Sequence, residues 1–235
     1  MRFDHSGLGL APVLLALLIA GCGEASGNDG GPAVDNEGEA AAAAQADTSE
    51  AVDLGDLGHD KGAVEEASIH VIEFSDFGCV HCQRFNQETF PALREEFIEP
   101  GHVAWKYIPV TVGGFPNVDE VTEVAECAAQ QDAFFDLKSR LYQDPDAWSG
   151  ADDPHQVAFD WAEEEGLDVG ALRSCQEAGE GSARVQEQTS SAVQLGLQAT
   201  PTFVINGQPI QGAPSLEAFR DFFRQELEEQ APPDG

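Results

Sequence analysis

The sequence predicts an α/β fold in which an all-helical subdomain is inserted between two segments that share one sheet. Three observations lead to this fold class. Residues 68–110 follow a strand, helix, strand pattern, which is typical of a βαβ unit. Apolar residues at helical spacing then continue from about 117 to 196, and a strand-like run returns at 200–207.

Residues 1–21 have the pattern of a signal peptide that directs export. Their apolar run, Leu8–Ala20, is too short to span a bilayer. It ends in Ile-Ala-Gly before Cys22, which resembles the lipobox of bacterial lipoproteins, whose cysteine is lipidated and becomes the mature first residue. The alternative is an ordinary secretory peptide with an incidental Cys22. Both place the mature protein outside the cytoplasm, and lipidation would anchor it in the cell envelope, facing the periplasm or the extracellular side.

Residues 22–65 are rich in glycine, alanine and acidic residues and contain no aromatic side chain. Such a segment buries too little apolar surface to offset the conformational entropy that folding removes. We therefore expect an acidic flexible tether here, followed by a single folded domain at 66–230.

The first part of that domain should form strand, helix and strand in turn. SIHVIEF at 68–74 is rich in β-branched and apolar residues and predicts a buried strand. Apolar residues at helical spacing follow, and Pro91 within them is expected to kink the helix. HVAWKYIPV at 102–110 predicts the second strand.

The last part should add a hairpin and a closing helix. TPTFVING at 200–207 ends in Asn-Gly, which favours a two-residue type I′ turn into a partner strand, QPIQG. An amphipathic helix follows, and Ser215 has the position of its N-cap.

The charge is extreme, with 43 acidic residues against 11 basic ones and a net charge of -32. Such a surface repels phosphate, which excludes nucleic acid as a partner. It also offers no basic patch to anionic lipid, so membrane contact is expected only through the lipid anchor. We interpret the charge as a strongly solvated surface suited to high salt, and a specific cationic partner is the alternative.

Cys79 and Cys82 form a Cys-x-x-Cys pair at the junction of the first strand and its helix. Haem attachment needs a histidine directly after the pair, and residue 83 is Gln. Zinc usually takes four ligands, and the other two candidates, Cys127 and Cys175, stand alone, so we expect no metal. A purely structural disulfide in so tight a loop would add little stability.

Redox chemistry has a positive physical argument. Cys79 would lie at a helix N-terminus, where unpaired N–H groups and the helix dipole stabilise a thiolate. His81, when charged, would add to that stabilisation. Cys82, one turn further along, would be the resolving thiol.

This order of features resembles the DsbA-like thiol:disulfide oxidoreductases of the thioredoxin fold: a strand, Cys-x-His-Cys, a helix, a helical insertion, and Thr-Pro before a strand. The resemblance covers residues 66–230, with the insertion at about 117–196. It implies an enzyme that needs no cofactor. It also implies reduced secreted proteins as substrates and a membrane enzyme that reoxidises the pair.

The resemblance also implies roles for individual residues. Cys79 would be the sulfur that substrates attack, Cys82 would close the disulfide, and His81 would occupy the family's histidine position. Glu73 matches a buried carboxylate that handles the proton of the inner thiol, although a solvent-facing acid is the alternative. Thr200 and Pro201 match the family's cis-proline site, which offers main-chain hydrogen bonds to an extended substrate.

Cys127 and Cys175 fall in the helical insertion. Outside the cytoplasm we expect them to pair as a structural disulfide, and the alternative is two inert buried thiols. With Cys22 lipidated, the number of remaining cysteines is even, as expected for an exported protein.

These features favour an extracytoplasmic oxidase that donates the Cys79–Cys82 disulfide to secreted proteins. Val80 stands where strongly oxidising relatives carry proline, and Thr200 is also found among isomerases and reductases, so a reductase or isomerase remains an alternative. A redox-silent peptide-binding or chaperone module of the same fold is a second alternative.

The lipobox interpretation predicts how the expressed protein partitions. The wild type should enter a detergent phase, because a lipidated Cys22 is apolar, whereas Cys22→Ser should be released as soluble protein. Phase separation followed by immunoblotting measures this, and equal partitioning of the two proteins would contradict lipidation.

Overall fold

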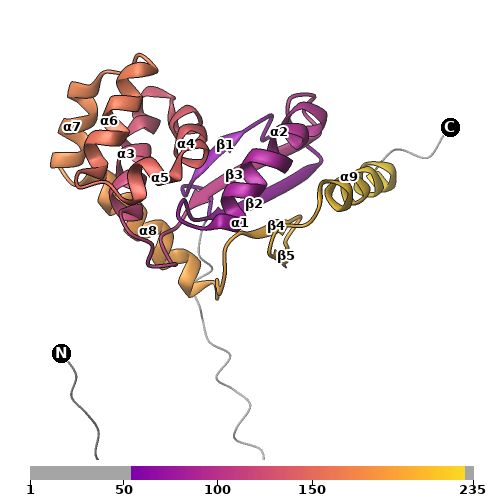
Figure 1. Ribbon diagram of the computed structural model, residues 1–235. Helices are drawn as coiled ribbons and strands as arrows, with labels where there is room; N and C mark the ends of the chain where they lie inside the picture. Colours follow the sequence, from indigo (N-terminus) through magenta and orange to yellow (C-terminus); the bar gives the residue numbers. More distant parts are fainter. Residues whose placement is uncertain (1–53, 231–235) are drawn as a thin grey trace, which may run out of the picture. The chain divides into compact units, whose positions relative to one another are not determined.

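The computed structural model describes residues 54–230 (Figure 1), so the signal peptide, Cys22 and most of the expected tether lie outside the described residues. Its centre is a five-stranded mixed sheet with the strand order β1-β3-β2-β4-β5. β2 and β3 are parallel, and the other neighbours are antiparallel. The strands are β1 (His59–Lys61), β2 (Ile69–Ser75), β3 (Val103–Pro109), β4 (Thr202–Ile205) and β5 (Gln208–Gln211).

The predicted βαβ unit is confirmed, because β2 and β3 lie parallel and are joined by a helical connection. That connection alternates between α-helix and wider π-type turns: α1 (Val80–Arg84), η1 (Phe85–Thr89), α2 (Phe90–Leu93) and η2 (Arg94–Ile98). The N–H of Phe90 bonds to the carbonyl of Phe85, five residues back, just before Pro91. Proline has no N–H and its ring clashes with the carbonyl four residues back, so the expected interruption takes the form of a widened turn.

The expected tether is wrong at its C-terminal end, because residues 54–65 belong to the domain. β1 pairs with β3 and places His59 opposite Tyr107. Leu57 is buried and packs with Phe74 and Ile108. The segment lacks the apolar content to fold by itself, but the edge of β3 offers it unpaired backbone groups and an apolar face already built by distant residues.

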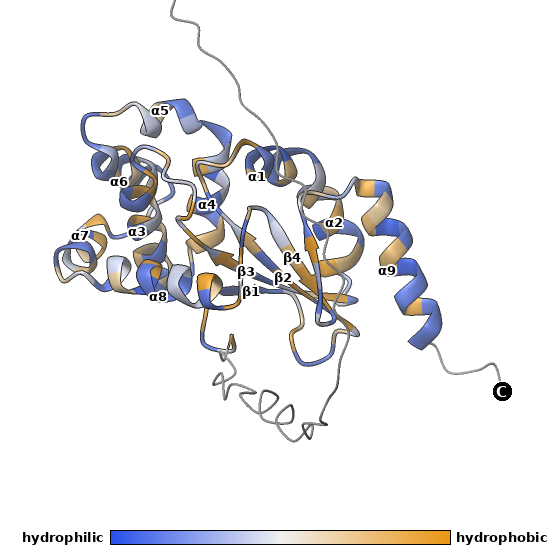
Figure 2. Cartoon of the chain, turned by 90° about the horizontal axis from the view of Figure 1, so that it is seen from below, coloured by the Kyte–Doolittle hydropathy of each residue, from blue (hydrophilic) through white to orange (hydrophobic). Residues whose placement is uncertain are grey.

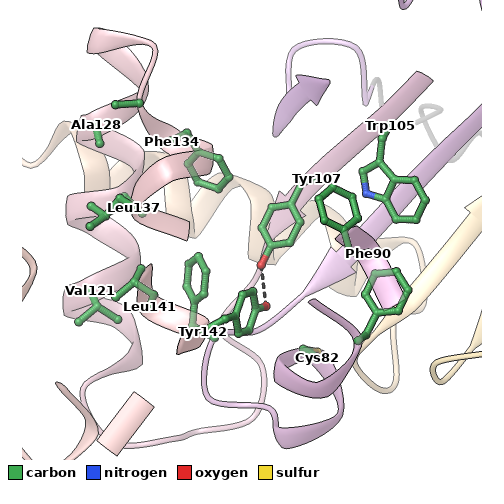
Figure 3. Close-up of a cluster of buried hydrophobic side chains, with 14 of the residues drawn as sticks. Cys82, Phe90, Trp105, Tyr107, Val121, Ala128, Phe134, Leu137, Leu141 and Tyr142 are labelled. Atoms are coloured by element: carbon green, nitrogen blue, oxygen red, sulfur yellow. Dashed lines mark hydrogen bonds between the residues drawn. The ribbon is translucent and has the colours of Figure 1, made fainter. Parts of the chain in front are cut away.

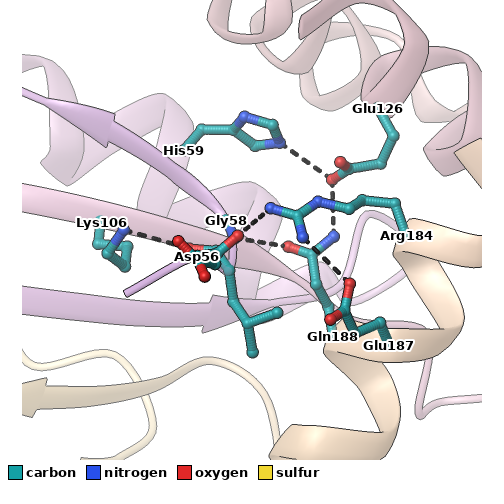
Figure 4. Close-up of polar contacts among 9 residues, drawn as sticks. Asp56, Gly58, His59, Lys106, Glu126, Arg184, Glu187 and Gln188 are labelled. Atoms are coloured by element: carbon teal, nitrogen blue, oxygen red, sulfur yellow. Dashed lines mark hydrogen bonds and ion pairs between the residues drawn. The ribbon is translucent and has the colours of Figure 1, made fainter. Parts of the chain in front are cut away.

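Polar contacts also fasten β1 to the helical insertion (Figure 4). His59 Nε2 lies 3.0 Å from Glu126 Oε1, and Gln188 Nε2 donates to the same carboxylate at 2.9 Å. Gln188 in turn accepts a hydrogen bond from the main-chain N–H of Gly58 at 2.9 Å. β1 therefore links the sheet edge to two helices of the insertion.

The helical insertion is confirmed between 118 and 194. Its central helix, α3, is buried along most of its length. Gly181 of α8 lies so close to it that a Cβ there would come within 2.4 Å of the Glu123 carbonyl oxygen. The helices are α3 (Val118–Ala128), η3 (Ala129–Gln131), α4 (Phe134–Gln143), α5 (Pro145–Ser149), α6 (Pro154–Glu164), α7 (Val169–Glu177) and α8 (Glu180–Gln194).

Cys127 of α3 and Cys175 of α7 form a disulfide, as expected, so the alternative of two inert thiols is wrong. The bridge closes a loop with a sequence separation of 48 residues. In the chain-entropy model a loop of this length stabilises the fold by about 4 kcal/mol. The disulfide therefore holds two neighbouring helices of the insertion together.

The C-terminal hairpin and helix also follow the sequence. Asn206 and Gly207 both have positive φ, 46° and 83°, as a type I′ turn between β4 and β5 requires. In α9 (Leu216–Gln230), Ser215 Oγ accepts the N–H of Ala218 at 3.2 Å, which is an N-cap bond. Hydrophobic and hydrophilic residues alternate around α9 (Figure 2), and its Phe219 and Phe223 are buried.

Aromatic side chains join the sheet to the insertion (Figure 3). Tyr107 of β3 and Tyr142 of α4 share a hydrogen bond of 2.7 Å between their hydroxyls, and Phe134 packs beside Tyr107. All three are buried. The hydrophobic core is thus continuous from the sheet into the insertion, which fixes α4 against the end of the βαβ unit.

None of the helices between 54 and 230 is long and apolar enough to cross a bilayer.

Candidate active site

Cys79 and Cys82 lie where β2 ends and α1 begins. Cys79 is the N-cap residue of α1, and its N–H donates to the carbonyl of Asp76 at 3.0 Å in the preceding turn. Both cysteines are free thiols; Cys79 is 7% exposed and Cys82 is 0% exposed. The turn therefore leaves Cys79 slightly accessible to solvent and buries Cys82 completely in the first turn of the helix.

Thr200 and Pro201 face this pair, and the peptide bond between them is cis, as the resemblance implied. The sheet explains their position, because β4 pairs with β2 and places Thr202 opposite Phe74, near the end that leads to the cysteines. The thiol of Cys79 donates to the carbonyl oxygen of Thr200 at 3.3 Å. Two segments 121 residues apart in the sequence thus meet at one sulfur.

The surroundings push the pKa values of the two thiols apart. Hydrogen bonding from the Cys82 thiol lowers the pKa of Cys79 to about 5 against the opposing effect of burial, with further help from the Thr200 side chain and the main-chain N–H groups of Cys82 and His81. Burial, and then the neighbouring Cys79, raise the pKa of Cys82 far above its usual range. The reduced pair therefore holds one proton at neutral pH, on Cys82.

His81 is exposed at the rim of the site. Its main-chain N–H helps to lower the pKa of the Cys79 thiol. Main-chain N–H groups at a helix N-terminus stabilise a thiolate whatever the side chains of the residues that donate them. The expected contribution of the His81 imidazole stays a prediction.

Glu73 is fully buried, so the alternative of a solvent-facing acid is wrong. Its carboxylate accepts hydrogen bonds from Trp105 Nε1 at 3.0 Å and from Asn86 Nδ2 at 3.1 Å. Burial raises the pKa of the Glu73 carboxyl, and the charge of Lys138 opposes that rise. Asn86 also donates to the carbonyl of Cys82 at 3.0 Å, which links the carboxylate to the helix turn that carries the inner thiol.

A protein-family model described as Thioredoxin matches residues 62–224. The chain belongs to the thioredoxin family. A crystal structure of DsbA from Chlamydia trachomatis matches it with a TM-score of 0.64 and 19% identity, over 75% of this chain and 95% of that one. This likeness confirms the predicted thioredoxin-like fold with an inserted helical subdomain.

This thioredoxin-family chain is similar to two relatives and matches different shares of their lengths. Disulfide bond formation protein D of Bacillus subtilis is 22% identical over 170 residues, which cover 69% of this chain and 74% of that protein. The Na(+)/H(+) antiporter NhaA 3 of Salinispora tropica is 30% identical over 165 residues, which cover 69% of this chain and 24% of that protein. The chain thus spans about a quarter of the antiporter and about three quarters of the disulfide bond formation protein.

Lys138 is a site residue that the sequence analysis missed. It comes from α4 of the insertion, is 2% exposed, and donates through Nζ to Asn86 Oδ1. The ammonium also lies 4.4 Å from the ring centre of Phe90 and 4.5 Å from that of Tyr107. Burial lowers the pKa of Lys138 to about 8, while the charge of Glu73 opposes that effect.

A signal for Lys138 was present in the sequence. The chain has only three lysines, and this one stands between Phe134, Leu137 and Leu141 in an apolar stripe. A lysine at such a position is rarely buried without a partner. Periodicity alone could not show that Lys138 bonds to Asn86 and lies within reach of the charge of Glu73 on β2.

A pocket of about 530 Å³ opens beside Thr200 and His81. Arg84, Glu88 and Ser215 also line it, so its wall carries charged and polar groups next to the cis-proline segment. The residues from 54 to 230 contain no cluster of three or more histidine, cysteine, aspartate or glutamate side chains arranged to hold a metal ion.

The low pKa of Cys79 can be measured directly. Thiolate absorbance at 240 nm should show one ionisation with a midpoint near pH 5 in the reduced protein. Cys82→Ala should raise that midpoint, because the Cys82 thiol is the largest cause that lowers the pKa of Cys79. In the control Cys79→Ala no thiolate should form below pH 8, and an unchanged midpoint in Cys82→Ala would contradict this account.

The same shift fixes how the stability of the reduced protein depends on pH. A thiol whose pKa is lower in the folded than in the unfolded state stabilises the fold fully above the unfolded pKa of about 8.5. That contribution is lost as the pH falls towards about 5. Denaturant unfolding should therefore show that the free energy of unfolding of the reduced protein decreases, relative to that of the oxidised protein, as the pH falls from about 8.5 to about 5.

Proposed function

We propose that this protein is a thiol:disulfide oxidoreductase that acts as an oxidase and donates the Cys79–Cys82 disulfide to secreted proteins. The observation that carries the proposal is the difference between the two thiols: Cys79 is slightly accessible and has a pKa of about 5, whereas Cys82 is fully buried and keeps its proton. A stabilised Cys79 thiolate favours the reduced pair, which makes the disulfide a stronger oxidant. Membership of the thioredoxin family and the relative called disulfide bond formation protein D support the same activity.

The exchange would proceed in two steps. A client thiolate attacks the Cys79 sulfur, the bond to Cys82 breaks, and a mixed disulfide forms. The client's second thiolate then attacks the client sulfur, and Cys79 leaves as a thiolate. Two electrons pass from the client to the enzyme pair. One client proton ends on Cys82, and the other is released.

Cys79 is suited to both steps. Cys79 is the less buried member of the pair, 7% exposed against 0% for Cys82, so the client reaches its sulfur first. A thiol of low pKa is also the better leaving group in the second step. The helix N-terminus therefore serves the reaction by stabilising the leaving sulfur.

Cys82 needs a proton as it leaves, because a buried thiolate is unstable. We propose Glu73 as the donor, since its buried carboxyl has a raised pKa and Asn86 joins it to the Cys82 turn. Lys138 reaches the same network through Asn86 and limits how far the pKa of Glu73 rises. The insertion would thereby tune a proton donor that lies on the sheet.

An extended client segment would lie along Thr200 and Pro201, whose main chain is next to the Cys79 sulfur. The pocket lined by Arg84 and Glu88 continues from that segment. We propose that client side chains beside the reacting cysteine occupy this pocket.

Location and reoxidation are part of the proposal. The signal peptide pattern and Cys22 support a lipid-anchored protein outside the cytoplasm. A membrane enzyme would then reoxidise the Cys79–Cys82 pair. A reductase or isomerase is the alternative, because Val80 replaces the proline of strongly oxidising relatives.

The redox direction can be tested by equilibrium with glutathione. The reduction potential of the pair should lie above about -200 mV, nearer to oxidases than to thioredoxin at about -270 mV. Cys82→Ser should accumulate mixed disulfides through Cys79, because no resolving thiol remains. Cys79→Ser should neither oxidise a dithiol peptide nor form adducts. A potential near that of thioredoxin would overturn the oxidase and favour the reductase.

The role of Glu73 can be tested by the rate of client oxidation. Glu73→Gln should slow oxidation of a dithiol peptide by about a hundredfold, the lower range for loss of a general acid. When the rate of client oxidation is measured against pH, Lys138→Met should move the transition due to Glu73 to higher pH, because Lys138 lowers the pKa of that carboxyl. Lys106→Met is the matched control, since Lys106 pairs with Asp60 instead. A Glu73→Gln rate equal to that of the wild type would exclude Glu73 as the donor.

A further inference from the structure

Asp76 lies three residues before Cys79, and the reaction described above does not use its carboxylate. The residue is fully buried. One carboxylate oxygen accepts the N–H of Gly78 at 2.9 Å, and the other accepts the N–H groups of Val112 and Gly113, each at 3.1 Å. A single side chain therefore binds two turns, one before Cys79 and one that follows β3.

The two turns pack tightly against each other. A Cβ on Gly78 would lie 2.4 Å from Phe115 Cβ, and a Cβ on Gly113 would lie 2.0 Å from Phe115 Cε2. With glycine at both positions, the Phe115 side chain can lie against both turns without moving. Asp76 supplies hydrogen bonds on the inner side of this contact, so it sets the position of the turn that presents Cys79.

The charge of Asp76 also acts on the site. The carbonyl of Asp76 accepts the N–H of Cys79 at 3.0 Å, so the carboxylate and the reacting sulfur belong to the same turn. Burial raises the pKa of Asp76 to about 6, three main-chain N–H groups oppose that rise, and the charge of Cys79 adds to it. Cys82 and Tyr142 also lie close to this turn, and both stay protonated near neutral pH because their pKa values are raised. His81, two residues after Cys79, is a further titratable group and is exposed.

We propose that Asp76 is a positioning residue for Cys79 whose charge couples the redox state of the pair to a proton. The carboxylate holds the Cys79 turn against the Val112–Gly113 turn and repels the Cys79 thiolate. Reduction of the disulfide and protonation of Asp76 therefore favour each other. The coupling builds on the proposed thiol:disulfide exchange and adds a pH dependence to it.

The electrons and protons balance. A client dithiol gives two electrons to the Cys79–Cys82 bond, which breaks, and a disulfide forms in the client. Two protons leave the client: one goes to Cys82 and the other goes to solvent or to Asp76. At mildly acidic pH, uptake by Asp76 removes the repulsion and makes the pair easier to reduce than it would be beside a charged carboxylate.

Asp76→Asn tests the coupling through the glutathione equilibrium, which needs no client. At pH 7.5 the variant should favour the reduced pair by about tenfold, since an adjacent like charge shifts a pKa by about one unit or more. At pH 5 the two proteins should converge, because Asp76 is then protonated in the reduced wild type. A difference that is absent, or that is the same at both pH values, would overturn the proposal.

Glu126→Gln is the matched control, because it neutralises a buried carboxylate that bonds to His59 and Gln188 and not to the active-site turns. It should leave the equilibrium unchanged at both pH values. A wild type that does not equilibrate with glutathione at all would refute the proposed function, whereas the comparison with Asp76→Asn refutes only the coupling.

A measurement on the wild type covers the case in which Asp76→Asn fails to fold. Carbon-13 NMR of the labelled carboxyl should show Asp76 titrating at higher pH in the reduced than in the oxidised protein, because only the reduced form carries the thiolate. Equal titration midpoints in the two forms would overturn the coupling.

Discussion

The burial of the Cys82 sulfur is the constraint on which the rest of the site depends. Burial disfavours the thiolate of Cys82, so this thiol keeps its proton at neutral pH and donates a hydrogen bond to Cys79. That bond is the largest cause of the low pKa of the outer thiol. The difference between the two cysteines is therefore produced by their depth, and the helix N-terminus adds to it.

Two ionisable groups close to the buried sulfur are buried as well. Glu73 and Asp76 lie on the same strand and turn, and each is fully enclosed. The structure satisfies them differently: Glu73 bonds to side chains, Trp105 and Asn86, whereas Asp76 bonds to main-chain N–H groups of two turns. Asn86 joins Glu73 to the Cys82 turn through side chains, while the main-chain partners of Asp76 hold two turns together. These two carboxylates thus suit two tasks in the proposed chemistry.

The helical insertion is part of the site and not an attachment to it. Its helix α4 carries Lys138, which bonds to Asn86 of the Glu73 network, and Tyr142, whose hydroxyl shares a hydrogen bond with the hydroxyl of Tyr107. Such contacts need α4 to be held at a fixed distance from the sheet. The continuous core around Phe134 supplies that support from within, and the Cys127–Cys175 disulfide binds α3 to α7. The contacts of His59 and Gln188 with Glu126 join β1 and α8 to α3.

The sequence by itself determined the features that depend on local spacing. The Cys-x-x-Cys step, the strand before it, the Asn-Gly turn and the Ser215 cap each follow from a few neighbouring residues, and the structure confirms their local geometry. The expected even number of cysteines and the expected oxidising location led to the pairing of Cys127 with Cys175, which the structure shows.

Tertiary structure decided the features that join distant segments. Lys138 meets Asn86 across 52 residues, and Asp76 meets Gly113 across 37. β1 forms within a segment whose composition predicted a tether, because an existing sheet edge receives it. Burial, and every pKa shift that follows from burial, arises from surfaces brought together by the whole fold, so no window of sequence contains it.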